Sequence, residues 1–320
     1  MGGNVFKNGT TRRYSEAEYA EVVIRIHPLL VKIGGRFGVI PAYEEKDDFG
    51  DMDILIVPSC LWDRKLLDTH FKSGGNVSHN GGVWSLVFEE IQVDLITTSD
   101  EGFDPAMDYF SYNDFGNLRG KIIHKFGMKF GHDGLTFPVR SADHILGNIM
   151  LSRDAVKVNE LFGFKAGPFT YLEDMFESVI GSPYFNPAVF SFEAMNAAGR
   201  VRDKKRSSYN SFLKYIEKMD GEYYPFHKDK SLYLDWIFHE FPHAKPQFDR
   251  LLERKAIIEA AALKFNGDLV REWTGLDGVE LGRLMKEVRP LYPPDIVIRS
   301  TESQIMEHVK RIHNANKTNS

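Results

Sequence analysis

The sequence predicts an α+β protein whose mixed helix-and-strand first half is followed by a mostly helical second half. Three observations support this fold class. Up to about residue 140, one amphipathic helical segment is followed by short β-branched runs, and beyond that point apolar residues recur almost only at helical spacing. A chain of 320 residues with 42% apolar side chains is also long enough for two hydrophobic cores. We therefore expect two domains, residues 1–140 and residues 141–320.

Composition excludes several classes of protein. The single cysteine, Cys60, excludes a disulfide-stapled fold, and we expect it to be a buried apolar residue. Because no apolar run approaches the ~18 residues of a membrane helix, we expect no membrane partner and a cytoplasmic protein, in the host cytoplasm if the chain is viral. The formal net charge of −5 means that any nucleic-acid binding must come from a local basic patch. The oligomeric state is left open.

In the first half, residues 15–32 form the predicted helix. Their apolar residues recur at helical spacing, and Ser15 is a suitable N-cap with two glutamates in the turn that follows. Gly34 and Gly35 end this helix. The runs 52–57, 84–88 and 91–96 are rich in β-branched and apolar residues, so we predict strands there. The last two either form a hairpin or lie as neighbours.

Helical spacing dominates the second half of the chain. The domain boundary is placed at residues 136–141, where a proline, an arginine and a serine follow the last compact motif. The predicted helices beyond it are residues 143–150, 171–180, 209–219, 232–238, 248–265 and 279–288.

The Gly50–Ile56 segment carries the clearest chemical signal, because two aspartates stand two positions apart in a predicted strand. Side chains alternate between the faces of a strand, so Asp51 and Asp53 share a face opposite Met52. Asp94 lies in a later predicted strand and joins them if the two strands are neighbours. The sequence therefore predicts a cluster of two or three carboxylates.

Such a cluster has two interpretations. Close carboxylates repel one another, which is costly unless a hard divalent cation such as Mg²⁺ binds between them. The alternative is a set of solvent-facing residues on a half-exposed strand. Gly50 allows the backbone to approach a ligand closely, and the amides of Gly34 and Gly35 are suited to phosphate, so both features favour the metal site.

At these residues the sequence resembles the nucleotidyltransferases of the DNA polymerase beta superfamily. Gly50–Ile56 is similar to the G-D-x-D-h-h-h strand of that family, and Val93–Ile96 to its third-aspartate strand. Asp108–Arg119 resembles the segment of the family X DNA polymerases that lines the incoming nucleotide. Residues 124–135 are similar to the helix and turn that follow it. The resemblance covers roughly residues 10–150.

The resemblance implies a nucleotidyltransferase palm, in which a mixed sheet carries helices on one face. It also implies that Asp51, Asp53 and Asp94 are catalytic and bind two Mg²⁺ ions, with Mn²⁺ as a possible substitute. The serine of the family's usual Gly-Ser pair is absent here, which leaves backbone amides and Arg36 or Lys46 to hold the triphosphate. The nucleotide-binding residues implied by the resemblance are Gly34, Gly35, Arg36, Gly50, Tyr109, Phe110, Asn117 and Arg119.

The second half contains a dense basic cluster with two interpretations. A run of charges is often a solvated helix face, whereas a nucleotide-transferring palm needs a surface that holds the acceptor phosphates. Residues 264–284 also resemble the C-terminal helical segment of CCA-adding and poly(A)-adding enzymes, although a plain helical hairpin remains an alternative. The cluster consists of Arg200, Arg202, Lys204, Lys205 and Arg206.

Together these features predict a metal-dependent enzyme that transfers a nucleotide from a nucleoside triphosphate to the 3′-hydroxyl of a nucleic acid and releases pyrophosphate. DNA synthesis and untemplated addition to an RNA such as tRNA are both left open. Two further alternatives are a catalytically inactive nucleic-acid-binding protein of the same fold and transfer onto a small molecule or a protein.

Overall fold

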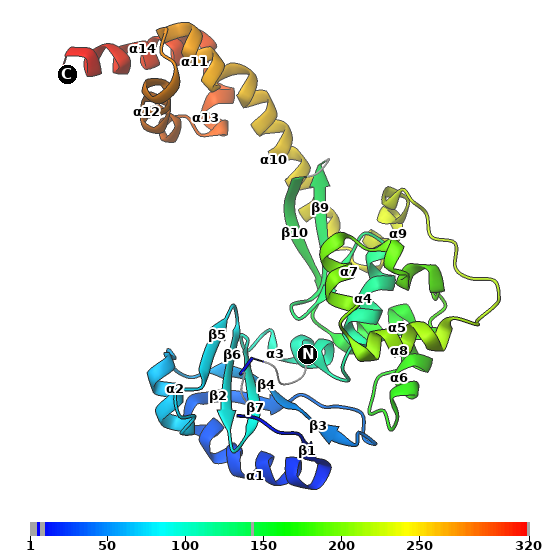
Figure 1. Cartoon of the computed structure of the whole chain (residues 1–320). Helices are drawn as coiled ribbons and strands as arrows, with labels where there is room; N and C mark the ends of the chain where they lie inside the picture. The colour runs from blue at the N-terminus through cyan, green and yellow to red at the C-terminus, as the bar shows by residue number, and fades with distance from the viewer. Residues whose placement is uncertain (1–4, 7–9, 142–143, 319–320) are drawn as a thin grey trace. The chain divides into compact units, whose positions relative to one another are not determined.

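The computed structural model describes residues 5–6, 10–141 and 144–318 (Figure 1). The chain divides into two compact units. The first unit comprises Met1–Pro138 and Met150–Phe241, and the second comprises Val139–Ile149 and Pro242–Ser320. The predicted palm and helical domains, residues 1–140 and 141–320, stay predictions. The mixed α+β class is confirmed.

The first unit contains a mixed five-stranded sheet. Its strand order is β2-β4-β7-β6-β5, and β4 and β7 are parallel whereas the other neighbours are antiparallel. The three predicted strands are confirmed, and the last two of them form a hairpin. The strands are β2 (Gly34–Val39), β4 (Asp51–Pro58), β5 (Val77–Asn80), β6 (Val83–Phe88) and β7 (Ile91–Thr97).

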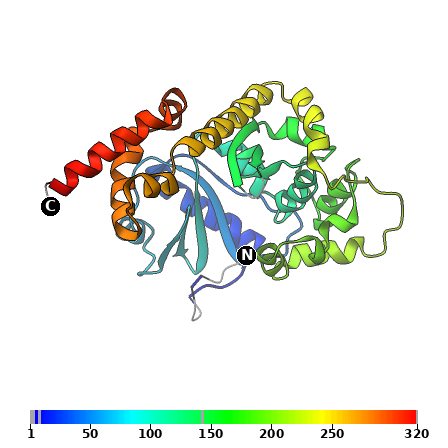
Figure 2. The ribbon, with the colours of Figure 1, turned by 90° about the horizontal axis from the view of Figure 1, so that it is seen from above.

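Two helices cover one face of this sheet. The predicted first helix is confirmed as α1 (Glu16–Ile33), and Ser15 and Glu18 form a capping box at its start. Together with α2 (Arg64–Phe71), α1 packs on the fully buried side chains that alternate with the aspartates, such as Met52. In both views α1 lies next to the sheet (Figure 1, Figure 2).

The opposite face of the sheet is also partly covered. Helix α3 (Phe103–Phe110) packs on Leu55, which shares a face with the aspartates. Helices therefore lie on both faces, which differs from the predicted one-sided sheet, because the far end of the carboxylate face is itself apolar and needs cover. Cys60 follows β4 and is exposed, so the prediction that it is buried is wrong.

The rest of the first unit is mostly helical. Two-stranded β1–β3 pairing holds the start of α1 to the chain just before β4. The elements are β1 (Tyr14–Ser15), β3 (Asp48–Phe49), α4 (Phe115–Lys125), β8 (Lys129–Gly131), α5 (Ala155–Phe162), α6 (Leu172–Ile180), η1 (Pro187–Phe190), η2 (Phe192–Ala194), α7 (Ala197–Asp203), α8 (Ser207–Ile216), η3 (Lys230–Tyr233) and α9 (Leu234–Glu240).

A second sheet corrects one prediction. The helix expected at residues 143–150 is instead strand β10 (His144–Ser152), which lies beside β9 (Gly134–Ser141) in a three-stranded sheet of order β10-β9-β8. The run ends with buried Ile149 and Leu151 two positions apart, which is strand alternation. The sequence pattern was too short to separate this period from a helical one.

The second unit has a hydrophobic core of its own, built from helices drawn in yellow to red (Figure 1, Figure 2). The helices predicted at 248–265 and 279–288 are confirmed. No helix in the described part of the chain is long and apolar enough to cross a membrane. The elements are α10 (Ala244–Lys264), α11 (Gly267–Thr274), α12 (Gly278–Val288), η4 (Arg289–Leu291), α13 (Pro294–Arg299) and α14 (Glu302–Thr318).

Candidate metal centre

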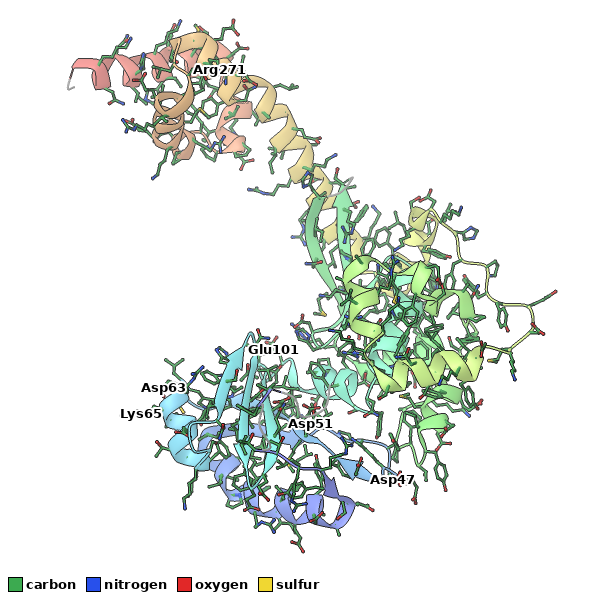
Figure 3. All side chains as sticks on the ribbon, viewed as in Figure 1. Asp47, Asp51, Asp63, Lys65, Glu101 and Arg271 are labelled. Carbon is green, nitrogen blue, oxygen red and sulfur yellow. The ribbon has the colours of Figure 1, made fainter. Side chains whose placement is uncertain are left out.

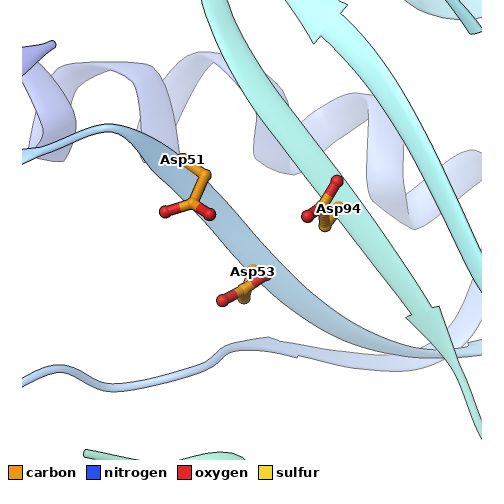
Figure 4. A group of neighbouring side chains, drawn as sticks. All are labelled: Asp51, Asp53 and Asp94. Atoms are coloured by element: carbon orange, nitrogen blue, oxygen red, sulfur yellow. The ribbon is translucent and has the colours of Figure 1, made fainter. Parts of the chain in front are cut away.

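Asp51, Asp53 and Asp94 converge on one face of the first unit's sheet (Figure 4). The parallel pairing of β4 and β7 sets Asp53 directly opposite Asp94. Each residue offers a carboxylate oxygen, and these oxygens lie within 4.8 Å of one another. The predicted carboxylate cluster is therefore present, and it includes the third aspartate.

The sheet geometry explains why the carboxylates meet. Met52 and Ile54 are completely buried against the helices on one face, which directs Asp51 and Asp53 to the other. Asp51 lies on the sheet, away from Lys65 of α2 and from Asp63, the N-cap of that helix (Figure 3). The apolar residues of β4 thus fix the direction in which its carboxylates point.

The electrostatics of the cluster match a cation site. Burial raises the pKa of Asp53 to about 7, and the neighbouring charges of Asp51 and Asp94 add to that shift. Burial also raises the pKa of Asp94, while hydrogen bonds from Ser85 and Gln92 oppose the shift. A hard divalent ion bound by these oxygens would relieve the repulsion that otherwise favours a proton. The donor set therefore fits Mg²⁺ or Mn²⁺.

A buried glutamine, Gln92, lies beside Asp94 on the same face of β7. The Gln92 side-chain Nε2 donates to both carboxylate oxygens of Asp94 at 3.0 Å, and its Oε1 accepts the Val5 backbone N–H at 3.0 Å. Gln92 and Ser85 are not among the site residues predicted from the sequence. The sequence does contain a signal for Gln92. It is a polar residue two positions before Asp94 in an otherwise apolar strand, and this spacing places Gln92 and Asp94 on the same face.

Lys46 is a cation that interacts with the carboxylates. Burial lowers the pKa of Lys46, and the charges of Asp51 and Asp53 act in the opposite direction. Its Nζ lies 4.5 Å from the centroid of the Phe49 ring, which stacks on Tyr19. Of the two side chains offered for the triphosphate, the structure brings Lys46 to the site.

The structure does not bring Gly34, Gly35 and Arg36 to the carboxylates. Strand β2 runs antiparallel to β4, so Gly34 pairs with Pro58 at the far end of β4. The Gly34 N–H is also engaged by the Leu30 carbonyl at the end of α1. The Arg36 guanidinium pairs with Asp104 and covers the Phe103 ring. This set was assigned to phosphate from the paired glycines and the family resemblance, and neither reveals the direction of β2.

The chain after β2 is the part that returns to the site. The Ile40 backbone N–H donates to the Asp53 carbonyl at 2.9 Å, and Lys46, further along the same segment, interacts with Asp51 and Asp53. Gly50 lies directly before Asp51, and a Cβ there would meet Arg13 Nη1 at 2.9 Å. Glycine at position 50 therefore leaves room for Arg13, which pairs with Asp48.

Tyr109 and Phe110 end α3 on the carboxylate side of the sheet. Phe110 lines a cavity of about 170 Å³ together with Leu55 and Ile96, which lie two residues beyond Asp53 and Asp94 on the same strands. Tyr109 packs edge-on against Phe130.

The other two predicted nucleotide-binding residues, Asn117 and Arg119, lie on α4 and make different contacts. The Asn117 Oδ1 accepts a hydrogen bond from Arg202 Nη2 at 3.2 Å. Arg119 is completely buried, and its guanidinium bonds to Asn159 Oδ1 at 2.6 Å and pairs with Asp108 Oδ2 at 2.9 Å. Arg119 is thus committed to packing α4 against α3 and α5, and the structure does not place its guanidinium at a nucleotide.

The basic cluster lies on α7 and the turn that follows it. Arg202 pairs with buried Asp203, and Arg206 pairs with buried Asp114. Lys204 lies over the Phe192 ring at 5.4 Å. Exposed members of the cluster are Arg200, Arg202, Lys204 and Lys205.

These contacts connect the basic cluster to the predicted nucleotide residues. Arg202 contacts Asn117, and the charges of Arg202 and Arg206 lower the pKa of Tyr109 while burial, the larger effect, raises it. The structure therefore brings the basic cluster, Tyr109 and Asn117 together within the first unit.

No family model matches the chain, and no curated protein matches it. The functional assignment therefore depends on the residues and their geometry.

Proposed function

We propose that this protein is a metal-dependent nucleotidyltransferase that joins a nucleotide from a nucleoside triphosphate to the 3′-hydroxyl of a nucleic acid and releases pyrophosphate. The observation that carries the proposal is the carboxylate cluster. Asp51, Asp53 and Asp94 offer oxygens within 4.8 Å of one another on two parallel strands. The resemblance of Gly50–Ile56 and Val93–Ile96 to the DNA polymerase beta superfamily supports the same activity.

Each part of the site has a role in this proposal. Asp51 and Asp53 would hold two Mg²⁺ ions, and Asp94 would hold the ion on the acceptor side. When bound, such ions lower the pKa of the attacking hydroxyl and neutralise charge on the departing pyrophosphate. Lys46 supplies a positive charge next to the carboxylates, where it would bind a phosphate oxygen of the nucleotide.

The basic cluster supports a nucleic-acid acceptor. Exposed arginine and lysine side chains bind phosphates irrespective of sequence. Lys204 and Lys205 are exposed on the turn after α7, and Arg202 links the cluster to Asn117. An acceptor strand held by this surface would bring its 3′-end toward the residues that the resemblance assigns to the nucleotide.

A transfer assay tests the proposal. The protein is incubated with each labelled nucleoside triphosphate, Mg²⁺ or Mn²⁺, and a panel of primer-template DNA, single-stranded DNA and tRNA acceptors. Acceptor extension and pyrophosphate release are both measured. Asp53→Asn removes a ligand charge at constant shape, so we expect at least a ~10³-fold loss of transfer. The matched control is Asp220→Asn, at an exposed aspartate after α8.

The outcomes separate the alternatives. Extension of tRNA without a template would identify RNA end addition, and a labelled protein or small molecule would identify a different acceptor. Near-normal transfer by Asp53→Asn would remove the catalytic assignment. No transfer to any acceptor, with nucleic-acid binding retained, would favour the inactive binding protein.

A further inference from the structure

Gln92 occupies an unusual position for a polar residue. It lies in the middle of the sheet on β7, is only 1% exposed, and has Asp51 on β4 and Val87 on β6 as its strand neighbours. Burying an amide is costly unless its hydrogen bonds are made. The contacts of Gln92 therefore explain why this residue type stands here.

The two hydrogen-bonding partners require the two ends of an amide. The Val5 N–H can only donate, so it needs the Gln92 Oε1, and the Asp94 carboxylate accepts, so it needs the Nε2. A glutamate would present no donor to Asp94, and a lysine or arginine would present no acceptor to Val5. Glutamine satisfies both partners without bringing a charge.

The contact restrains the Asp94 carboxylate. Gln92 Nε2 lies 3.0 Å from both oxygens of Asp94, and Ser85 on the neighbouring strand β6 adds a further hydrogen bond. The Asp94 carboxylate thus accepts hydrogen bonds from two side chains, while one of its oxygens lies within 4.8 Å of oxygens of Asp51 and Asp53. Because the amide is neutral, it restrains the carboxylate without a positive charge that would compete with a divalent ion.

We propose that Gln92 is a positioning residue that fixes the Asp94 carboxylate for metal binding. The proposal rests on the metal site of the proposed function. It adds that the chain at Val5 supports the metal site through this amide. Partners that orient a metal-binding carboxylate typically change metal affinity by about 10- to 100-fold when they are removed.

A metal-binding experiment tests the proposal without relying on catalysis. Mn²⁺ dissociation constants are measured by electron paramagnetic resonance for the wild type, Gln92→Met, Gln92→Asn and Asp94→Asn. We expect roughly 10-fold weaker Mn²⁺ binding for both Gln92 variants, since neither the thioether nor the shorter amide reaches both partners. The control, Gln247→Met on α10, makes the same chemical change in the second unit and leaves the constant unchanged.

Two further variants separate positioning from folding. Val5→Pro removes the donated N–H and should weaken Mn²⁺ binding by several-fold, whereas Val5→Ala keeps the N–H and should not. Thermal melts confirm that each variant is folded, and Gln92→Asn replaces Gln92→Met if the latter does not fold. Raising Mn²⁺ to saturation should restore the transfer rate of a folded Gln92 variant.

The measurements distinguish a failure of the Gln92 inference from a failure of the proposed function. If Asp94→Asn weakens Mn²⁺ binding while both folded Gln92 variants keep the wild-type constant, the positioning role is wrong and the proposed function stands. A transfer defect that persists at saturating Mn²⁺ would also overturn it. If the wild type binds no Mn²⁺ at all, the metal site and this inference fail together.

Discussion

The ionisation of Asp53 couples the carboxylate cluster to stability. Its pKa is about 7 in the folded protein, because burial and two neighbouring carboxylates disfavour its charge. The unfolded value is about 3.9, so between these pH values the folded state binds more protons than the unfolded state. Stability from this group is therefore fully present below about pH 4 and is lost as the pH rises through about 7. The cluster favours metal binding at some cost to the metal-free fold.

The substitution Asp53→Asn should remove this pH dependence. In the metal-free protein we expect Asp53→Asn to raise Tm relative to the wild type by roughly 2–5 °C at pH 8, and much less at pH 5. Thermal melts in chelator at both pH values measure the difference. Addition of Mg²⁺ at pH 8 should raise the wild-type Tm more than that of the variant. Parallel Tm profiles for the two proteins would show that Asp53 is ionised at no unusual cost.

At the scale of elements, α7 and its following turn present side chains of two kinds. Arg202 and Arg206 are paired with buried aspartates, whereas Lys204 and Lys205 are exposed. Charges already paired with buried carboxylates contribute to packing as well as to binding. The two lysines are therefore the cleaner test of acceptor binding.

Replacement of Lys204 and Lys205 together by alanine should weaken nucleic-acid binding for all sequences alike. We expect the slope of log K against log salt to fall by about two, since about one unit is lost with each phosphate contact. Fluorescence anisotropy between 50 and 200 mM salt, roughly the range in which such slopes are determined, measures it. A double alanine variant of Lys214 on α8 and Lys218 just after it, both exposed, carries the same charge change as a control. An unchanged slope in the Lys204 and Lys205 variant would make the cluster a solvated face.

The helices and strands also show which features of the fold and the site can be predicted from the sequence. The Asp51 and Asp53 pair was predictable because strand alternation is local, and the Ser15 cap because its pattern is confined to one turn. The distance of Gly34 from the carboxylates depends on the direction of β2, which no local pattern encodes. The burial of Arg119 depends on Asn159, which lies 40 residues away in sequence.

At the scale of the whole molecule, the two units have separate cores. The sheet residues around Met52 form one buried cluster, and residues of α10–α14 around Leu284 form another. The metal centre lies entirely within the first unit. A ligand that binds one unit stabilises that unit directly.

Calorimetry should therefore resolve more than one unfolding transition. Mn²⁺ should raise the midpoint of one transition by several degrees, about RT ln(1 + [L]/Kd) in free energy, and leave the other near its original temperature. The Asp94→Asn variant should lose the metal-dependent shift. A single transition that moves as a whole with Mn²⁺ would show that the units unfold cooperatively.

The path of the chain between the units bears on how the protein can be dissected. Residues 139–149 of the hairpin formed by β9 and β10 belong to the second unit although they precede α5 in the chain, and Gly147 packs against Leu251 of α10 so closely that a Cβ would meet its Cδ2 at 2.9 Å. A stop codon after Phe241 would strip this hairpin of its helical neighbour and leave apolar surface uncovered. Loss of solubility in such a truncation would thus report a severed packing contact, and a clean dissection requires shortening the hairpin at the same time.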